Sequence, residues 1–147
     1  DRTLNRALFK ALQASGMHLQ NYGTVFATIA DRDKEEALPL IRRFYNLGFN
    51  IQATEGTARF LKANGIRTHI LGKISEGSEE IPDALRQGHI AYVINTRDPG
   101  EGSANDGHHI RLLATENNVT IFTALDTVKV LLDVLEETTL TISTIDS

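Results

Sequence analysis

From Gly23 onward, short apolar runs alternate with segments of helical periodicity. Five of the apolar runs are short enough to be strands, and a helical segment separates each of them from the next. Their cores are continuously apolar, which is typical of parallel strands that are buried on both faces of a sheet. This alternation predicts an α/β fold with a doubly wound, mainly parallel sheet of five strands and helices on both faces.

The expected elements cover most of the chain. The strands are expected at residues 24–30, 49–53, 68–71, 89–95 and 119–122. The helices are expected from Asp31 or Asp33 to residue 47, and then at residues 56–64, 79–87, 108–117 and 124–137. Gly48 and Gly65 directly follow two of these helices, a position in which glycine often ends a helix. Residues 97–107 should form a loop, and the β-branched residues 138–145 should form a terminal strand or irregular chain.

The start of the chain forms a separate unit in this interpretation. Residues 2–15 carry apolar side chains at helical spacing, and Gly16 would end the helix that they predict. We expect residues 1–22 to be a helix and linker that connect to a preceding region, and residues 23–147 to be one domain. Because the helix is already under way at the first residues, we expect the chain to be a piece of a longer protein.

Composition narrows the classes of partner. The net charge of −4 and the pI of about 5.7 argue against general binding to nucleic acid or to an anionic membrane. The chain has no cysteine, which excludes disulfides and thiolate chemistry. No apolar run approaches the roughly 20 residues that span a bilayer, and no segment resembles a signal peptide. We therefore expect a cytoplasmic protein.

The segment from Phe49 to Ala58 predicts a strand that runs through a glycine-containing turn into a helix. Backbone N–H groups at the start of a helix lack partners within the helix, and the helix dipole favours negative charge there. Gly56 would allow a ligand to approach the backbone, and the hydroxyl groups of Thr54 and Thr57 could donate hydrogen bonds to it. This pattern indicates a phosphate-binding turn. The alternative is that Thr54 only caps the helix.

Further polar residues follow the other expected strands. Because the carboxyl ends of parallel strands lie at one edge of a sheet, these residues should gather there. The full expected set is Thr28, Lys34, Thr54, Gly56, Thr57, Lys73, Asn95, Thr96 and Arg97. The two lysines would bracket a phosphate, and Asn95 could pair with sugar hydroxyls or a base edge. The alternatives are that both lysines are solvated surface charges and that Asn95 and Thr96 form a turn.

The remaining motifs do not indicate a metal site or a catalytic centre. His108 and His109 are adjacent, so on a helix they face different directions, and no second pair of ligands has a suitable spacing for a metal. Gly72 and Lys73 are followed by Ile74, which lacks the hydroxyl group that holds Mg²⁺ in nucleoside triphosphatases. We therefore predict no metal ligands and no catalytic residues in this chain.

Six short segments, taken together and in their order along the chain, indicate a protein family more specifically than any one of them does alone. They are residues 33–35 (DKE), 48–49 (GF), 53–57 (ATEGT), 72–77 (GKISEG), 94–96 (INT) and 110–111 (IR). In this order they resemble the methylglyoxal synthase-like domain at the C-terminal end of the large subunit of carbamoyl phosphate synthetase. The resemblance covers roughly residues 23–137, and residues 5–12 are similar to the stretch that joins the synthetase body to this domain.

The resemblance implies a methylglyoxal synthase-like, Rossmann-type fold and a regulatory role. In that family the domain is not catalytic: it binds effectors and alters distant sites that make carbamoyl phosphate for pyrimidine and arginine biosynthesis. The implied parent enzyme is a glutamine-hydrolysing, ATP-dependent ligase that uses Mg²⁺, with K⁺ as a further candidate ion, whereas this domain itself would hold no cofactor. The implied partners are the rest of the large subunit, the glutaminase small subunit and, as one option, further copies of the chain.

The resemblance also implies roles for individual residues. Lys34, Thr54, Thr57 and Lys73 would bind the phosphate of the effector. Asn95 and Thr96 would face its ribose or base, Thr28 would line the same pocket, and Arg97 stands where some relatives have a small hydroxyl residue. Since relatives that respond to an acylated amino acid have an aromatic residue in place of Lys73, two lysines favour a phosphorylated effector. The candidates are uridine monophosphate, inosine monophosphate and phosphoribosyl pyrophosphate.

Two alternatives remain. Methylglyoxal synthase has the same fold and eliminates phosphate from dihydroxyacetone phosphate, which requires a carboxylate base beside the phosphate. The resemblance to that enzyme would imply a Gly-Gly-Asp segment and a His-Asp-Pro-Asp loop. At those places this chain has residues 72–76 (GKISE) and 105–109 (NDGHH). The other alternative is that the domain acts chiefly as an oligomerisation module.

Overall fold

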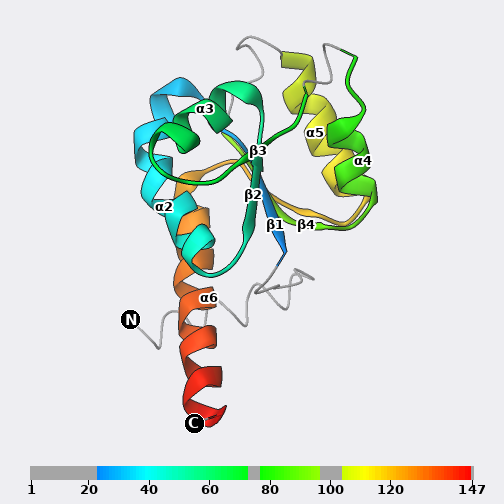
Figure 1. Ribbon diagram of the computed structural model, residues 1–147. Helices are drawn as coiled ribbons and strands as arrows, with labels where there is room; N and C mark the ends of the chain where they lie inside the picture. The colour runs from blue at the N-terminus through cyan, green and yellow to red at the C-terminus, as the bar shows by residue number, and fades with distance from the viewer. Residues whose placement is uncertain (1–22, 73–76, 97–103, 147) are drawn as a thin grey trace.

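The computed structural model describes residues 23–72, 77–96 and 104–146. Its centre is a parallel sheet of five strands in the order β3-β2-β1-β4-β5 (Figure 1). The strands are β1 (Thr24–Thr28), β2 (Asn50–Ala53), β3 (His69–Ile70), β4 (Ile90–Asn95) and β5 (Thr120–Phe122). The predicted parallel sheet of five strands is confirmed. The order of the strands reverses between β1 and β4, which makes that pair the switch point of the sheet.

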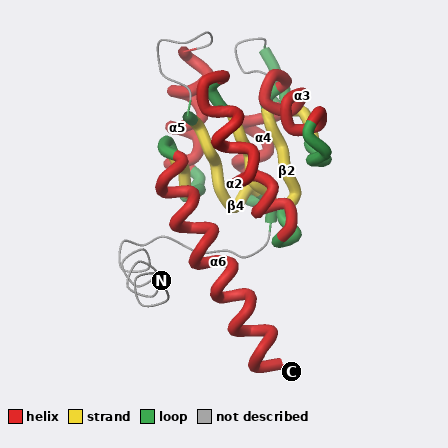
Figure 2. Tube along the Cα trace, turned by 90° about the vertical axis from the view of Figure 1, so that its left-hand side faces the viewer, coloured by secondary structure: helices red, strands yellow, loops and turns green. Residues whose placement is uncertain are grey.

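Helices cover both faces of the sheet, as predicted. They are the 3₁₀ turn η1 (Asp31–Asp33) and the helices α2 (Lys34–Asn46), α3 (Glu55–Ala63), α4 (Glu80–Arg86), α5 (Ala104–Glu116) and α6 (Leu125–Asp146). Figure 1 shows α2, α3 and α6 on one side of the sheet and α4 and α5 on the other, and Figure 2 shows α2 and α6 in front of the strands. Among the described residues, no helix is both long and apolar enough to cross a lipid bilayer.

Each face of the sheet has its own apolar core. Under α2, α3 and α6 lies the larger one, which contains four aromatic rings in contact: Phe44, Phe49, Tyr92 and Phe122. The smaller core lies under α4 and α5 and joins Phe26 and Val93 to Ile81 and Ile110. The strands are therefore buried from both sides, which explains why their sequences are continuously apolar.

Two of the expected element boundaries are wrong. Residues 138–145 are not a strand or irregular chain but continue α6 to Asp146. Once a helix is established, each further residue costs only a few tenths of a kcal/mol even when it is β-branched, so the strand propensity is overridden. The loop expected at 97–107 also ends early, because α5 begins at Ala104. Gly48 and Gly65, by contrast, have the positive φ angles of +100° and +83° expected of glycines that end helices. The helix expected at residues 2–15 lies outside the described residues.

An ion-pair cluster joins α2 to α6. The guanidinium group of Arg43 donates hydrogen bonds to both carboxylate oxygens of Glu136, over 3.0 and 2.5 Å, and to Asp133 over 2.7 Å. The hydrogen bond to Glu136 above all raises the pKa of Arg43, against the opposing effect of burial. Because the Arg43 side chain is only 26% exposed, the cluster is less screened by water than an ordinary surface pair.

We therefore expect Arg43→Met to lower the free energy of unfolding by about 1–2 kcal/mol, since two carboxylates lose their charge-assisted partner. Urea denaturation measures this change. Arg59→Met is the matched control, because Arg59 pairs with Glu55 one turn away on the exposed surface of α3, and such pairs contribute less than about 0.5 kcal/mol. Equal losses in the two variants would contradict a special role for the Arg43 cluster.

Candidate functional site

The predicted site residues that the structure describes come together at the carboxyl ends of β1, β2 and β4. Thr28, the last residue of β1, lies opposite Asn95, the last residue of β4. Thr54 is the N-cap residue of α3 and Thr57 lies in the first turn of that helix, and both are buried. Asn95 is fully buried, and Thr96 is 8% exposed. The cluster lies where β1 and β4 diverge, which is the usual ligand position in this class of sheet.

Two threonine hydroxyl groups hold the chain that leaves β1. The hydroxyl oxygen of Thr57 accepts a hydrogen bond from the backbone N–H of Ile29, over 3.0 Å. The hydroxyl oxygen of Thr96 accepts one from the backbone N–H of Ala30, also over 3.0 Å. A hydroxyl group that accepts one hydrogen bond can still donate its own proton. Both side chains therefore fix the local backbone and keep a donor for a further partner.

Thr54 is at the N-cap of α3, but its side chain does not cap the helix. Within the described part of the chain, it makes no capping hydrogen bond. Its hydroxyl group instead donates to the hydroxyl oxygen of Thr28, over 3.4 Å. The alternative that Thr54 serves as a helix cap is therefore wrong. The Thr54 side chain leaves the first N–H groups of α3 available to another acceptor.

Lys34 brings a positive charge to the start of α3. A Cβ atom placed on Gly56 would lie 3.7 Å from the ammonium nitrogen of Lys34. The Lys34 side chain is only 18% exposed, so the alternative of a fully solvated surface charge does not describe it. Its ammonium group pairs over 2.5 Å with Asp31, whose side chain is 94% exposed. A cation and a helix N-terminus therefore lie together, with an exposed carboxylate as the current partner of the cation.

A hollow of about 370 Å³ lies next to these residues, on the side of β4 and β5. The guanidinium group of Arg32 lies 3.5 Å from the carbonyl oxygen of Thr96 at its edge. The polar residues that line the hollow are Arg32, Asp33, Glu36, Thr96, Thr123 and Asp126. Of these, only Thr96 was predicted as a site residue. The sequence signal that could have found them is their position: Arg32 and Asp33 lie in the short turn after the first strand, and Thr123 directly follows the fifth strand.

Two of the predicted residues, Lys73 and Arg97, lie outside the described residues. They stay predictions. Neither the second lysine nor the arginine contributes to the geometry reported for this site, which rests on Lys34, the threonines and the start of α3.

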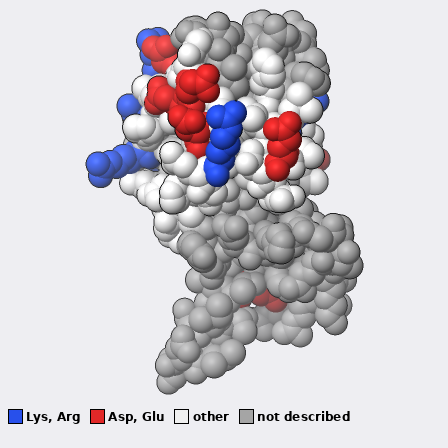
Figure 3. Space-filling view, turned by 90° about the vertical axis from the view of Figure 1, so that its right-hand side faces the viewer, with Lys and Arg blue, Asp and Glu red and all other residues white. Residues whose placement is uncertain are grey.

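The face formed by α4 and α5 shows how charge is distributed away from this site. In Figure 3 acidic and basic side chains both stand on that face and are interspersed. Surfaces that bind nucleic acid typically gather lysine and arginine on one face. The mixed charge on this face does not have that character.

The chain matches the model of a known protein family. The model of the MGS-like domain family matches residues 36–123, from the first turn of α2 through β5. The chain belongs to the MGS-like domain family. The family contains both enzymes and regulatory domains, and its fold agrees with the parallel sheet described above. In this MGS-like domain the α3 turn and the end of β4 lie within the matched residues, whereas Thr28 and Lys34 lie just before them.

The hydrogen bond from Ile29 to Thr57 makes a testable prediction. Thr57→Val should lower the free energy of unfolding by about 1–3 kcal/mol, because a buried backbone N–H loses its acceptor. The Ile29 amide should also exchange its hydrogen faster. Urea denaturation and hydrogen exchange measure the two effects. Thr115→Val is the control, since Thr115 is exposed on α5 and such changes usually stay within about 0.5 kcal/mol. Unchanged exchange at Ile29 would show that the bond does not form.

Proposed function

We propose that this MGS-like domain binds a phosphorylated small molecule at the carboxyl ends of β1, β2 and β4 and is a regulatory domain of a carbamoyl phosphate synthetase large subunit. The observation that carries the proposal is the position of Lys34. Its ammonium group lies beside Gly56 at the start of α3, where the helix cap is not occupied by the Thr54 side chain. Cations and helix N-termini both favour a doubly charged phosphate.

The surrounding groups suit the other oxygens of a phosphate. Thr57 and Thr96 each retain a hydroxyl proton after accepting a backbone N–H. Phosphate oxygens accept several such hydrogen bonds at once, and bonds to a charged acceptor are stronger than neutral ones. A carboxylate would fill fewer of these positions. The hydroxyl groups therefore support a phosphate rather than a carboxylate.

The identity of the effector rests on the resemblance and on the shape of the site. Lys73 would supply the second cation, and Arg97 would strengthen the hold on a pyrophosphate or close the loop. Asn95 and Thr96 would face the ribose or base, and the hollow of about 370 Å³ beside Thr96 offers room for part of such a ligand. Uridine monophosphate, inosine monophosphate and phosphoribosyl pyrophosphate are the candidates.

The parent enzyme is likewise part of the proposal. The ordered motifs that resemble the synthetase domain support it, and residues 1–22 would connect the domain to the body of the large subunit. The ATP sites, with Mg²⁺, and the glutaminase subunit would lie elsewhere in that assembly. A bound effector can alter those sites only to the extent that it binds two states of the enzyme with different affinity.

Calorimetric titration of the chain with the two nucleotides, with phosphoribosyl pyrophosphate and with dihydroxyacetone phosphate tests the proposal. We expect saturable binding of at least one nucleotide or phosphoribosyl pyrophosphate, and no turnover of dihydroxyacetone phosphate. Production of methylglyoxal would favour the enzyme alternative. Light scattering in the same samples would show whether the ligand changes the oligomeric state, as an oligomerisation module requires. Absence of binding by all four would refute the proposal.

Lys34 and Asp31 should have opposite effects on binding. Lys34→Ala should weaken binding of the phosphorylated ligand by about 1–3 kcal/mol, the range for hydrogen bonds to charged groups. Asp31→Asn should strengthen it by up to about 1 kcal/mol, because the exposed carboxylate no longer competes for the ammonium group. Calorimetry on both variants measures this, with Lys62→Ala, an exposed lysine of α3, as the control. Changes of the same sign in both variants would contradict the assigned site.

Replacement of Gly56 should change the stability of the domain and its affinity for the ligand in opposite directions. Gly56→Ala should raise the free energy of unfolding by up to about 1 kcal/mol, because alanine is the better helix residue and its Cβ atom would meet Lys34 only at 3.7 Å. The same methyl group would occupy the space between the ammonium and the α3 turn, so ligand affinity should fall. Thermal denaturation and calorimetry measure the two quantities. Unaltered affinity in a stabilised variant would show that the ligand does not approach Gly56.

A further inference from the structure

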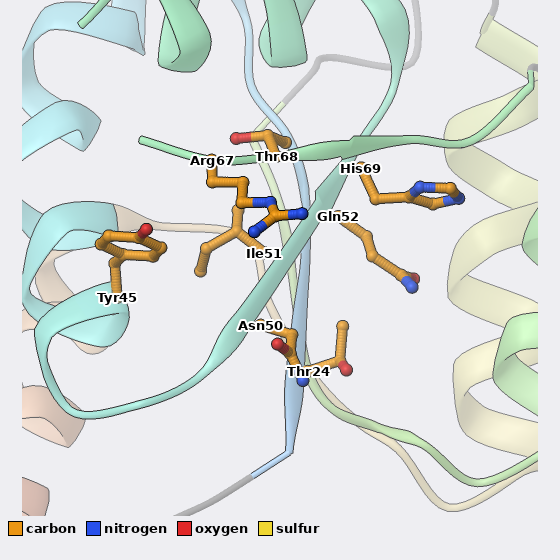
Figure 4. A pocket seen from close by; sticks show the side chains of 8 residues that line it. All are labelled: Thr24, Tyr45, Asn50, Ile51, Gln52, Arg67, Thr68 and His69. Atoms are coloured by element: carbon orange, nitrogen blue, oxygen red, sulfur yellow. The ribbon is translucent and has the colours of Figure 1, made fainter. Parts of the chain in front are cut away.

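The chain that leaves β3 begins next to the start of α3. In Figure 4 the side chains of His69 and Gln52, a register pair of β3 and β2, point to the same side of the sheet. Two residues further along, the backbone N–H of Leu71 donates a hydrogen bond to the carbonyl oxygen of Ala53, over 2.9 Å. Ala53 directly precedes Thr54, the N-cap residue of α3. The end of β3 is therefore fixed beside the strand-end site described above.

Gly72 and Ser78 are in close contact although six positions of the chain separate them. A Cβ atom placed on Gly72 would lie 2.7 Å from the hydroxyl oxygen of Ser78 and 2.8 Å from its Cβ atom. Both distances are well below the roughly 3.5 Å at which such atoms pack. Glycine is therefore required here by the close approach of the two residues, and the segment between them is closed at its base.

The carboxylate of Glu80 binds both sides of this contact. Its Oε1 atom accepts a hydrogen bond from the backbone N–H of Gly72, over 3.2 Å, and one from the hydroxyl group of Ser78, over 3.5 Å. The hydroxyl oxygen of Ser78 in turn accepts one from the backbone N–H of Glu80, over 3.2 Å. These three residues, Gly72, Ser78 and Glu80, form the Glu80 cluster, which joins the end of β3 to the start of α4.

The Glu80 cluster is not what holds the neighbouring elements in the fold. Leu71 and Ile81, which flank it on both sides, are buried in the core under α4 and α5. The hydrogen bonds of the cluster itself are exposed to solvent, and changes at exposed positions usually have small effects on stability. The effect of the Glu80 carboxylate is therefore on the place and direction in which the backbone leaves β3 at Gly72.

We propose that Glu80 is a positioning residue of the phosphate site and acts through Lys73. This inference rests on the proposed function, in which Lys73 supplies the second cation. A peptide bond joins Lys73 to Gly72, and the Cα atoms of neighbouring residues are only about 3.8 Å apart. Because the Glu80 carboxylate holds Gly72 beside the start of α3, it limits the region that the Lys73 ammonium group can occupy. The ligand then has less conformational entropy to overcome when it orders this lysine.

Electrostatic repulsion alone predicts the opposite effect of Glu80. A carboxylate close to the site repels an anionic ligand, so its removal should strengthen binding. If Glu80 acts by positioning Lys73, its removal should weaken binding instead. The sign of the change therefore distinguishes the two effects.

Calorimetric titration of the full chain tests the proposal, with whichever of uridine monophosphate, inosine monophosphate and phosphoribosyl pyrophosphate binds the wild-type chain most tightly. Glu80→Ala should weaken binding about three- to tenfold, the effect of one lost hydrogen bond to a charged group. Glu80→Gln removes the same charge but keeps an acceptor oxygen, so its affinity should stay within about twofold of the wild type. Glu79→Ala is the matched control and should not weaken binding, because the exposed Glu79 side chain does not cap α4.

Dependence on Lys73 separates positioning from a general loss of structure. Lys73→Ala should itself weaken binding about tenfold, and in that background Glu80→Ala should add less than about twofold. The amide hydrogen of Gly72 should exchange faster in Glu80→Ala and at the wild-type rate in Glu80→Gln. If none of the three ligands binds the wild-type chain, the proposed function is refuted and this inference with it. Wild-type binding that Glu80→Ala leaves unchanged or strengthens, or that it weakens equally with and without Lys73, would overturn this inference alone.

Discussion

Hydrogen bonds from two buried backbone amides to threonine side chains keep the strand ends in place. Ile29 donates to Thr57 and Ala30 donates to Thr96, so the chain that leaves β1 is fixed to the β2–α3 turn on one side and to the end of β4 on the other. A parallel sheet leaves the connections at its carboxyl edge free to diverge. Here they are held together by groups that can also contact a ligand.

The same arrangement explains how a cation comes to lie at a helix start. Lys34 is in the first turn of α2, directly after the segment that the threonines hold. Its ammonium group is therefore directed to Gly56 rather than to solvent. The ammonium group pairs with the carboxylate of Asp31, and this carboxylate is almost fully exposed to solvent. Such an exposed pair contributes little to stability, so a phosphate could replace the carboxylate at small cost.

Periodicity was enough to predict the sheet and the side on which the polar residues gather, because burial on both faces leaves a clear apolar signal in each strand. The hydrogen bonds that the threonine hydroxyl groups accept were not predictable from the sequence. Each joins two residues that are far apart in the chain, by 28 positions in one case and 66 in the other, so their distance in space depends on the whole fold. The capping alternative for Thr54 was wrong for a related reason: its hydroxyl group turns toward Thr28. Local propensity also failed at residues 138–145, where the established helix α6 continues.

The helix α2 has a charged contact at each end. Lys34 in its first turn lies beside Gly56 at the start of α3, and Arg43 in its last turn is bound to two carboxylates of α6. Nine residue steps of helix separate them, a length of about 14 Å. Pro39 lies between the two contacts and cannot donate the backbone hydrogen bond of its position, so the helical hydrogen-bond ladder is interrupted once over this length. The C-terminal helix, which extends away from the sheet in Figures 1 and 2, thus contacts the same helix that places Lys34 at the strand ends.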